Sequence, residues 1–323
     1  MRYKIIPILL AGATAAHADI LNSTQRFFGE DDNFAEYAED SGQVDGFEID
    51  EVPYSPADSD LGVQEVLVDR DEVDRLIFRF STSILRTDNA ANESNPLAFT
   101  PTGDEPSWLV ATRLSASWRP HLFDGWFADI GAGVDSLQFE DGGAVDYENY
   151  NGRVGIYKNF PDLDDLIFFT RYEYQRIATG SLLQSDYNAQ RIRAGLQKTL
   201  YAAPRHRITG GLSGALEWSA NPDMLQRDEV EMNVSYRYSI TDDLYTLASA
   251  TVSKFEYQDF GREDWSYGFG LELIWEMTKN VQLSASVFYD KNDSNTDTFG
   301  GFTPTNDYQS WTGGLGVGCQ WAF

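Results

Sequence analysis

The chain has 323 residues, and its formal net charge of −27 comes from 51 acidic and 24 basic residues. Nucleic acid is therefore not an expected partner, because binding to phosphates needs a basic surface. The single cysteine, Cys319, excludes an internal disulfide framework. No stretch approaches the ~20 continuous apolar residues of a membrane-spanning helix.

The first 18 residues have the pattern of a secretory signal peptide. Arg2 and Lys4 precede an apolar run over residues 5–10, and small residues then lead to Ala16 and Ala18. A charged start, a short apolar middle and a small-x-small end are typical of a cleaved export signal. The apolar run is too short to span a bilayer as a helix. We expect cleavage after Ala18.

Residues 19–74 form a strongly acidic segment. It contains 18 acidic residues against two basic ones, Arg26 and Arg70, a net charge of −16. This composition predicts a solvated segment rather than a packed domain. Two roles are open for it, a tail in solution or a plug that partly fills the domain that follows.

Residues 75–323 alternate in polarity in strand-sized stretches, with a unit that repeats about every forty residues. Each unit contains a strand, a polar loop, a returning strand and a short turn. The apolar positions predict twelve strands, whose first apolar residues are Leu76, Trp108, Trp126, Tyr150, Phe168, Ile192, Ile208, Val230, Leu244, Trp265, Val281 and Trp311. Because side chains alternate across a strand, each apolar set lies on one face of the sheet.

The predicted connections also alternate in length. Short turns are expected around residues 120–125, 161–165, 201–206, 241–243 and 278–280. Longer loops are expected around residues 87–106, 140–147, 179–186, 220–228, 258–263 and 291–309. This alternation is typical of an all-β, antiparallel up-and-down barrel that crosses a membrane, with both termini on the short-turn side. A soluble β-sandwich, which also alternates, is the alternative.

Tryptophan placement favours the barrel. Three strands carry a tryptophan pair on the apolar face, Trp108 with Trp118, Trp265 with Trp275, and Trp311 with Trp321. Ten residues of strand rise ~33 Å, which a tilt of ~40° reduces to ~25 Å along the barrel axis. That height matches the apolar band between two aromatic girdles, where an indole ring is in lipid and its N–H is in water.

The last residues resemble the C-terminal assembly signature of bacterial outer-membrane β-barrels. Gly318, Trp321 and Phe323 match the last positions of that pattern, whereas Gly316 occupies a position that is polar in the family. The resemblance covers the last strand as a motif and the rest of the chain only as a pattern. It implies a location in the bacterial outer membrane, in contact with its lipid, and binding of Trp321 and Phe323 to the barrel-assembly machinery.

The opposite face of the strands carries most of the charged residues and is predicted to line the lumen. The predicted lining residues are Arg79, Arg113, Arg153, Arg171, Arg191, Arg193, Arg237, Glu217, Glu231 and Glu272. Arg113, Arg153, Arg171 and Arg193 fall near mid-height on one wall, across from small polar and acidic residues. Guanidinium groups bind carboxylate or phosphate through a two-pronged contact. This arrangement predicts a porin-like diffusion channel for small solutes that are anionic or zwitterionic.

A second interpretation is equally compatible with the sequence. Arg79, Arg113 and Arg153 would pair with Asp129, Asp135 and Glu173 in a network that fills the lumen, because a barrel of this size can be open or filled. The protein would then be a non-conducting barrel with a structural or surface-adhesion role through its loops. A role in secretion or lipid handling ranks third.

Enzymatic activity, a metal ion and a cofactor are not expected. His121 and His206 fall in predicted short turns, away from any position where a histidine base could serve a lumenal site. Asp293, Asn295 and Asp297 have the first spacings of a calcium loop, but the glycine and the closing glutamate of that motif are missing.

Overall fold

The computed structural model describes residues 75–88, 106–123, 125–140, 146–163, 166–179, 187–221, 226–258, 261–295 and 307–322. The predicted signal peptide, the acidic segment 19–74 and Phe323 lie outside these residues.

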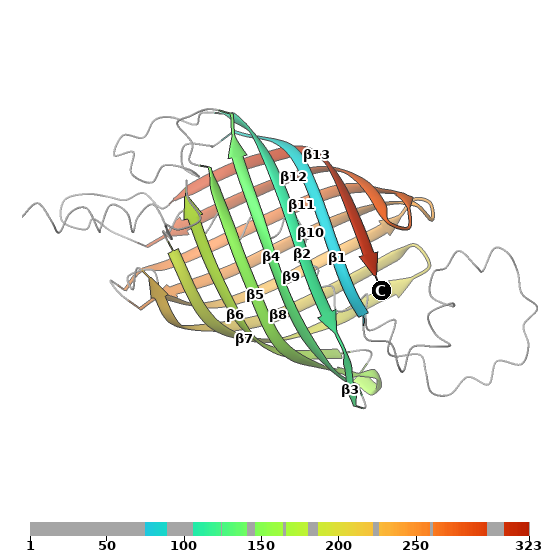
Figure 1. Ribbon diagram of the computed structural model, residues 1–323, viewed down its shortest axis with the longest axis horizontal. Helices are drawn as coiled ribbons and strands as arrows, with labels where there is room; N and C mark the ends of the chain where they lie inside the picture. Colours follow the sequence, from blue (N-terminus) through green and yellow to red (C-terminus); the bar gives the residue numbers. More distant parts are fainter. Residues whose placement is uncertain are drawn as a thin grey trace, which may run out of the picture.

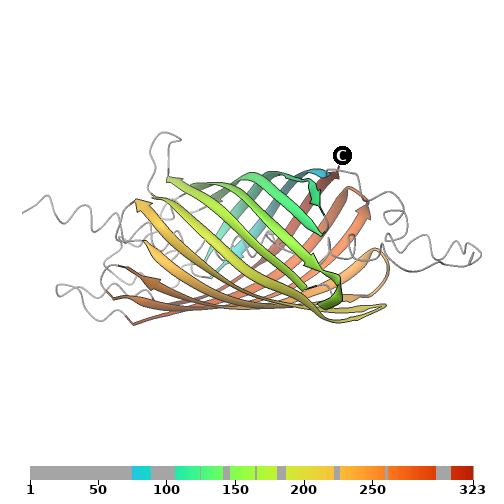
Figure 2. The ribbon, with the colours of Figure 1, turned by 90° about the horizontal axis from the view of Figure 1, so that it is seen from below.

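The structure is an antiparallel β-barrel closed by pairing of its first and last strands (Figures 1 and 2). The strands are β1 (Arg75–Thr87), β2 (Ser107–Arg119), β3 (His121–Phe123), β4 (Trp126–Phe139), β5 (Tyr147–Phe160), β6 (Leu166–Thr179), β7 (Tyr187–Ala203), β8 (His206–Asn221), β9 (Arg227–Ser239), β10 (Leu244–Tyr257), β11 (Glu263–Thr278), β12 (Val281–Ser294) and β13 (Tyr308–Ala322). Twelve of them form the barrel wall, and the three-residue β3 pairs only with β4. The predicted fold class and strand number are therefore confirmed.

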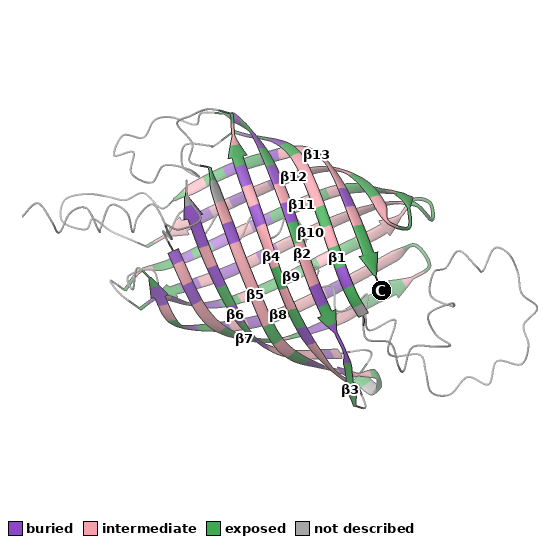
Figure 3. Cartoon of the chain, in the orientation of Figure 1, coloured by how far each residue is buried: buried purple, intermediate pink, exposed green. Residues whose placement is uncertain are grey.

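The strands alternate between outward apolar and inward polar residues, and Figure 3 shows the resulting alternation of buried and exposed positions along β2 and β4. Leu114, Leu216 and Leu315, on three different strands, are more than half exposed. Polar and charged neighbours on the same strands, such as Arg113 and Glu217, are buried. An outer surface of exposed apolar side chains is favourable only in an apolar solvent such as lipid. A closed β-barrel also forms all its backbone hydrogen bonds within the sheet, which a lipid environment requires.

All eight tryptophans lie on the outward-facing side, near the ends of strands. Trp108, Trp218, Trp265 and Trp311 are at the end that carries the longer connections, called here the long-loop end. Trp118, Trp126, Trp275 and Trp321 are at the opposite end, called here the short-turn end, where Lys158 Nζ lies 5.1 Å from the Trp126 ring centroid. This arrangement gives one aromatic girdle at each end of the apolar band.

The structure adds local features that the alternating pattern did not predict. The first short turn contains β3, and β5 is followed by a 3₁₀ turn, η2 (Pro161–Leu163). The pairing of β7 with β8 shifts register at Gln190/Arg191 and at Thr199/Tyr201. Each bulge inserts an unpaired residue, so that the residues beyond it change faces, and a parity count along one strand does not predict where this happens. Among the described residues, no helix is long and apolar enough to span a membrane.

Candidate functional site: the charged inner wall

The inner face of the barrel has two walls of opposite charge. The inward strand residues of β2 and β4–β9 include nine arginines and six carboxylates among those described, Arg113, Arg119, Arg153, Arg171, Arg191, Arg193, Arg207, Arg227, Arg237, Asp129, Asp135, Glu173, Glu217, Glu229 and Glu231. The inward side chains that are described on β10–β13 and β1 include one arginine and four carboxylates, Arg79, Asp264, Glu272, Glu276 and Asp290. The first group, called here the arginine wall, thus carries a surplus of three positive charges and faces a surplus of three negative charges.

Ion pairs join β2, β4 and β5 across the arginine wall. Asp129 accepts from Arg119 Nε at 3.2 Å and from Arg153 Nε at 2.7 Å. Arg113 Nε lies 3.3 Å from Asp135, whose other carboxylate oxygen accepts from the amide of Asn149 at 3.0 Å. Each carboxylate is buried and meets at least one guanidinium, which is the condition under which a buried charge is tolerated.

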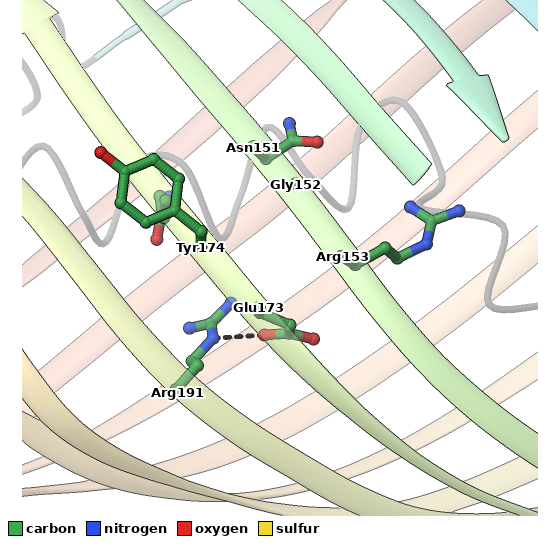
Figure 4. A pocket seen from close by; sticks show the side chains of 7 residues that line it. Asn151, Gly152, Arg153, Glu173, Tyr174 and Arg191 are labelled. Carbon is green, nitrogen blue, oxygen red and sulfur yellow. Dashed lines mark hydrogen bonds and ion pairs between the residues drawn. The ribbon is translucent and has the colours of Figure 1, made fainter. Parts of the chain in front are cut away.

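A second cluster joins β6, β7 and β9. Glu173 accepts hydrogen bonds from Arg171 and Arg191, and Arg193 Nε lies 3.4 Å away. Arg193 also contacts Glu229 through both terminal nitrogens, at 2.8 and 3.3 Å. Figure 4 shows Glu173 and Arg191 joined on the inner wall, beside a hollow that Arg153 and Asn151 of β5 also line. Glu173 and Glu229 are thus shared among three arginines.

Glycines on the same face make room for these long side chains. A Cβ at Gly131 would lie 3.0 Å from Arg153 Cζ, and a Cβ at Gly155 would lie 2.5 Å from Arg171 Cβ. Because a larger residue at either position would clash, these glycines give Arg153 and Arg171 room beside the neighbouring strand.

The ten predicted lining residues all lie on inward-facing positions, but not all in the same cluster. Arg113, Arg153, Arg171, Arg191 and Arg193 belong to the two ion-pair clusters described above. The other five have separate surroundings. Arg79 donates to Gln320 Oε1 at 2.8 Å, and the Arg237 guanidinium lies 3.8 Å from the Tyr245 ring centroid. Glu217 accepts from Tyr187 at 3.2 Å, Glu231 accepts from Ser253 at 3.4 Å, and Glu272 lies on the opposite wall. Of the predicted assembly residues, Gly318 and Trp321 lie on β13, inward and outward respectively.

Four charged residues of the arginine wall were in neither the predicted lining set nor the predicted network, namely Arg119, Arg207, Arg227 and Glu229. All four have the same strand parity as predicted members, so that parity alone would have found them. Within the predicted network, Arg113 lies beside Asp135 and Arg153 pairs with Asp129. Glu173 instead pairs with Arg171, Arg191 and Arg193, which the network did not include.

Exposure varies within each wall. Arg113, Arg171 and Arg193 are only 6–7% exposed. Arg153 and Asn233 on the arginine wall are half-buried, as are Ser249 and Ser284 at mid-height on the opposite wall. The accessible part of the interior therefore borders both walls.

The long-loop end contains an inward apolar cluster that the sequence pattern did not predict. It is formed by Leu85, Leu109, Ala111, Leu137, Ile177, Tyr187, Ala189 and Ala220, each at most 4% exposed. Seven of these residues have the parity of the arginine wall, and Ala220 faces inward because it follows the register shift in β8. All eight occupy the long-loop ends of their strands. On β1, β2, β4 and β6–β8 the inner face is thus apolar near the long-loop end, whereas β9, β11 and β12 carry the buried charged residues Arg227, Glu229, Asp264 and Asp290 there.

The two described histidines lie at the short-turn end. His206 Nδ1 and the Tyr236 hydroxyl are 2.8 Å apart on the outward-facing side. His121 is on β3, and its ring contacts that of Phe127 at 5.1 Å between centroids.

The second part of the barrel matches a known family of porin-like barrels. Residues 225–321, which run from just before β9 to Trp321 in β13, match the profile of a family described as "Putative beta-barrel porin 2". A search of curated proteins gives no match.

The chain is also similar to solved barrel structures at low identity. One is an outer membrane channel from Pseudomonas putida F1, with 6% identity, a TM-score of 0.49, and coverage of 78% of this chain and 98% of that chain. Another is an anion-selective porin from Comamonas acidovorans, with 10% identity, a TM-score of 0.35, and coverage of 78% and 100%. A third is the translocator domain of the autotransporter NalP from Neisseria meningitidis, with 11% identity, a TM-score of 0.41, and coverage of 82% and 98%.

Proposed function

We propose that this chain, a porin-like β-barrel of the bacterial outer membrane, is a diffusion channel for small solutes that are anionic or zwitterionic. The observation that supports this function is the opposite charge of the two inner walls. A solute with a carboxylate or phosphate group would be drawn to the arginine wall, and an ammonium group on the same solute would face the carboxylates opposite. The half-buried small residues of the second wall leave the space along which the solute would pass.

The paired state of the arginines does not remove their attraction for anions. Glu173 and Glu229 are shared among Arg171, Arg191 and Arg193, and the described side chains of the arginine wall as a whole keep their surplus of three positive charges. In a low-dielectric wall, such an excess acts over a longer distance than it would in water. The selectivity would therefore follow the local wall charge and not the chain's total of −27.

One observation favours a second candidate, a non-conducting barrel with a structural or adhesive role. Three of the four arginines at mid-height are nearly inaccessible, as expected for a network whose purpose is to fill the lumen. A folded wild-type barrel that carries no current in a planar bilayer would support this candidate over the channel.

The channel is tested by ion selectivity in a planar bilayer under a salt gradient. Wild-type protein should conduct and prefer anions, and replacing Arg113, Arg153, Arg171 and Arg193 by Gln should move the reversal potential toward cation preference. Since those replacements leave carboxylates of the network unpaired, a second variant avoids the folding problem. Glu272→Gln with Glu276→Gln on the opposite wall should move the reversal potential toward stronger anion preference.

Lys254→Gln provides the matched control, because Lys254 lies on the outer face beside Glu256 and Glu263. The reversal potential of the Lys254→Gln variant should equal that of the wild type. A conducting barrel whose selectivity is unchanged in both wall variants would contradict the role of the two walls.

A further inference from the structure

Arg153 differs from the other ion-paired arginines of the inner wall in the contacts of its guanidinium. It donates through Nε to Asp129 at 2.7 Å, and its terminal nitrogens contact no acceptor among the described residues. Its side chain is 17% exposed, whereas those of the other five arginines in the two ion-pair clusters are 3–11% exposed. Because Asp129 holds the guanidinium through Nε, the two terminal nitrogens remain as a two-pronged donor for an oxyanion.

A carboxylate sets the direction of three amide side chains beside Arg153. Asp135 Oδ2 accepts from the amide nitrogens of Asn149 at 3.0 Å and Asn151 at 3.3 Å. Asn149 Oδ1 in turn accepts from the amide nitrogen of Gln175 at 3.3 Å. An ionised carboxylate only accepts hydrogen bonds, so each amide turns its nitrogen toward Asp135 and its oxygen away from it. The amide oxygens of Asn151 and Gln175 are thereby left as acceptors, and neither accepts a hydrogen bond from a described residue.

Strand register brings these groups around one hollow. Asn151 and Arg153 are two residues apart on β5, and Asn151 is the direct cross-strand neighbour of Gln175 on β6. Figure 4 shows Asn151 and Arg153 extending away from β6. Both lean over glycines of β4, where a Cβ at Gly133 would lie 3.0 Å from Asn151 Oδ1. The hollow between β5 and β6 thus has a cationic donor and two neutral acceptors at its rim.

This combination of groups discriminates among anions. A simple oxyanion would satisfy Arg153 but would give the neighbouring amide oxygens no donor, and a polar group left unpaired lowers affinity. A hydroxyl on the carbon next to a carboxylate would donate to an amide oxygen while the carboxylate binds the guanidinium. An ammonium group in that place could also donate, but it would lie on a wall with a surplus of three positive charges.

We propose that the hollow between β5 and β6 is a binding subsite for small α-hydroxycarboxylates. Arg153 binds the carboxylate, and Asn151 accepts a hydrogen bond from the hydroxyl. The role of this subsite in transport rests on the proposed channel, whereas binding itself does not require conduction.

Binding is tested on the folded full chain in detergent micelles by saturation-transfer NMR of the solute's methyl group. Lactate, propionate and alanine share that methyl group and differ in the substituent next to the carboxylate. Lactate should bind about fivefold more tightly than propionate, the effect of one ordinary hydrogen bond, and more tightly than alanine. Equal affinities for lactate and propionate would overturn the subsite. An affinity for alanine that equals or exceeds that for lactate would overturn the choice of a hydroxyl.

Two variants assign the binding groups. Asn151→Ala should abolish the advantage of lactate over propionate and leave the affinity for propionate unchanged. Arg153→Gln should weaken both solutes at least about tenfold, the scale of a charge-assisted hydrogen bond, and Asp129 then keeps its contact with Arg119. Asn233→Ala, which removes an inward amide on β9, is the matched control and should bind like the wild type. Electrophoresis of unheated samples shows that each variant is folded. A lactate preference that survives Asn151→Ala would overturn the role of Asn151.

Conductance separates the subsite from the channel. Lactate should reduce the ion current of the wild-type protein in a planar bilayer more than propionate does at the same concentration and ionic strength. A barrel that binds lactate but carries no current would refute the channel and leave the subsite in place. A conducting barrel that shows no preference for lactate would leave the channel in place and overturn the subsite.

Discussion

Glu173 is the residue at which the contacts of the arginine wall converge. It accepts from Arg171 on its own strand and from Arg191 on β7, and Arg193 lies 3.4 Å away. Its side chain is about one-tenth exposed, so water contributes little to its solvation. A carboxylate in such a position keeps three guanidinium groups in one small volume, and their mutual repulsion appears once it is removed.

Glu173→Gln should therefore lower the free energy of unfolding by about 3 kcal/mol, the usual effect of removing one partner of a buried ion pair. Urea unfolding in lipid vesicles would measure this change by tryptophan fluorescence, because the tryptophans leave the membrane interface when the barrel unfolds. Glu256→Gln, next to Lys254 on the outer face, should have a far smaller effect. Equal effects of the two substitutions would mean that the cluster does not stabilise the barrel.

The strands are the elements that could be predicted best from the sequence. The alternation of apolar and polar residues predicts which face of each strand is apolar. The tryptophans at both ends predict the length of β2, β11 and β13. Register shifts and β3 could not be predicted, because they depend on pairing between strands and not on the polarity of one strand. The inward Leu85 and Leu137 escaped prediction for a related reason: a parity rule treats every inward position alike, whatever its height.

The two faces of a strand should differ in their tolerance of charge, and β9 offers adjacent positions near mid-depth for this test. Val234 faces outward and is exposed, whereas Asn233 faces inward and is half-buried. Val234→Arg should destabilise the barrel by about 2–4 kcal/mol, the cost of a guanidinium at the bilayer midplane. Asn233→Arg should cost clearly less in the same urea titration. A larger loss from the Asn233 substitution would contradict the assignment of the faces.

At the scale of the whole molecule, the alternation of residues along each strand predicted which side chains line the inner wall. It did not predict which of these side chains pair with each other. Arg153 and Asp129 were expected to face the same space, yet which arginine meets which carboxylate depends on barrel closure and strand shear. The charge difference between the two walls emerges only after every strand has been placed beside its neighbours. The acidic total of the chain conceals it, because much of that total lies in residues 19–74.

The orientation of the barrel in the membrane gives the last prediction. Asn295 follows β12 at the long-loop end, and Asp242 lies in the turn between β9 and β10 at the short-turn end. Both residues are exposed. In outer-membrane barrels, longer loops face the cell exterior and short turns face the periplasm. In a Cys319→Ser background, Asn295→Cys should therefore react with a membrane-impermeant maleimide on intact cells. Asp242→Cys should react only after the outer membrane has been permeabilised, and both should react equally in denatured protein. Labelling of Asp242→Cys alone on intact cells would mean that the barrel is inserted in the opposite direction, and the acidic segment would then be on the cell surface.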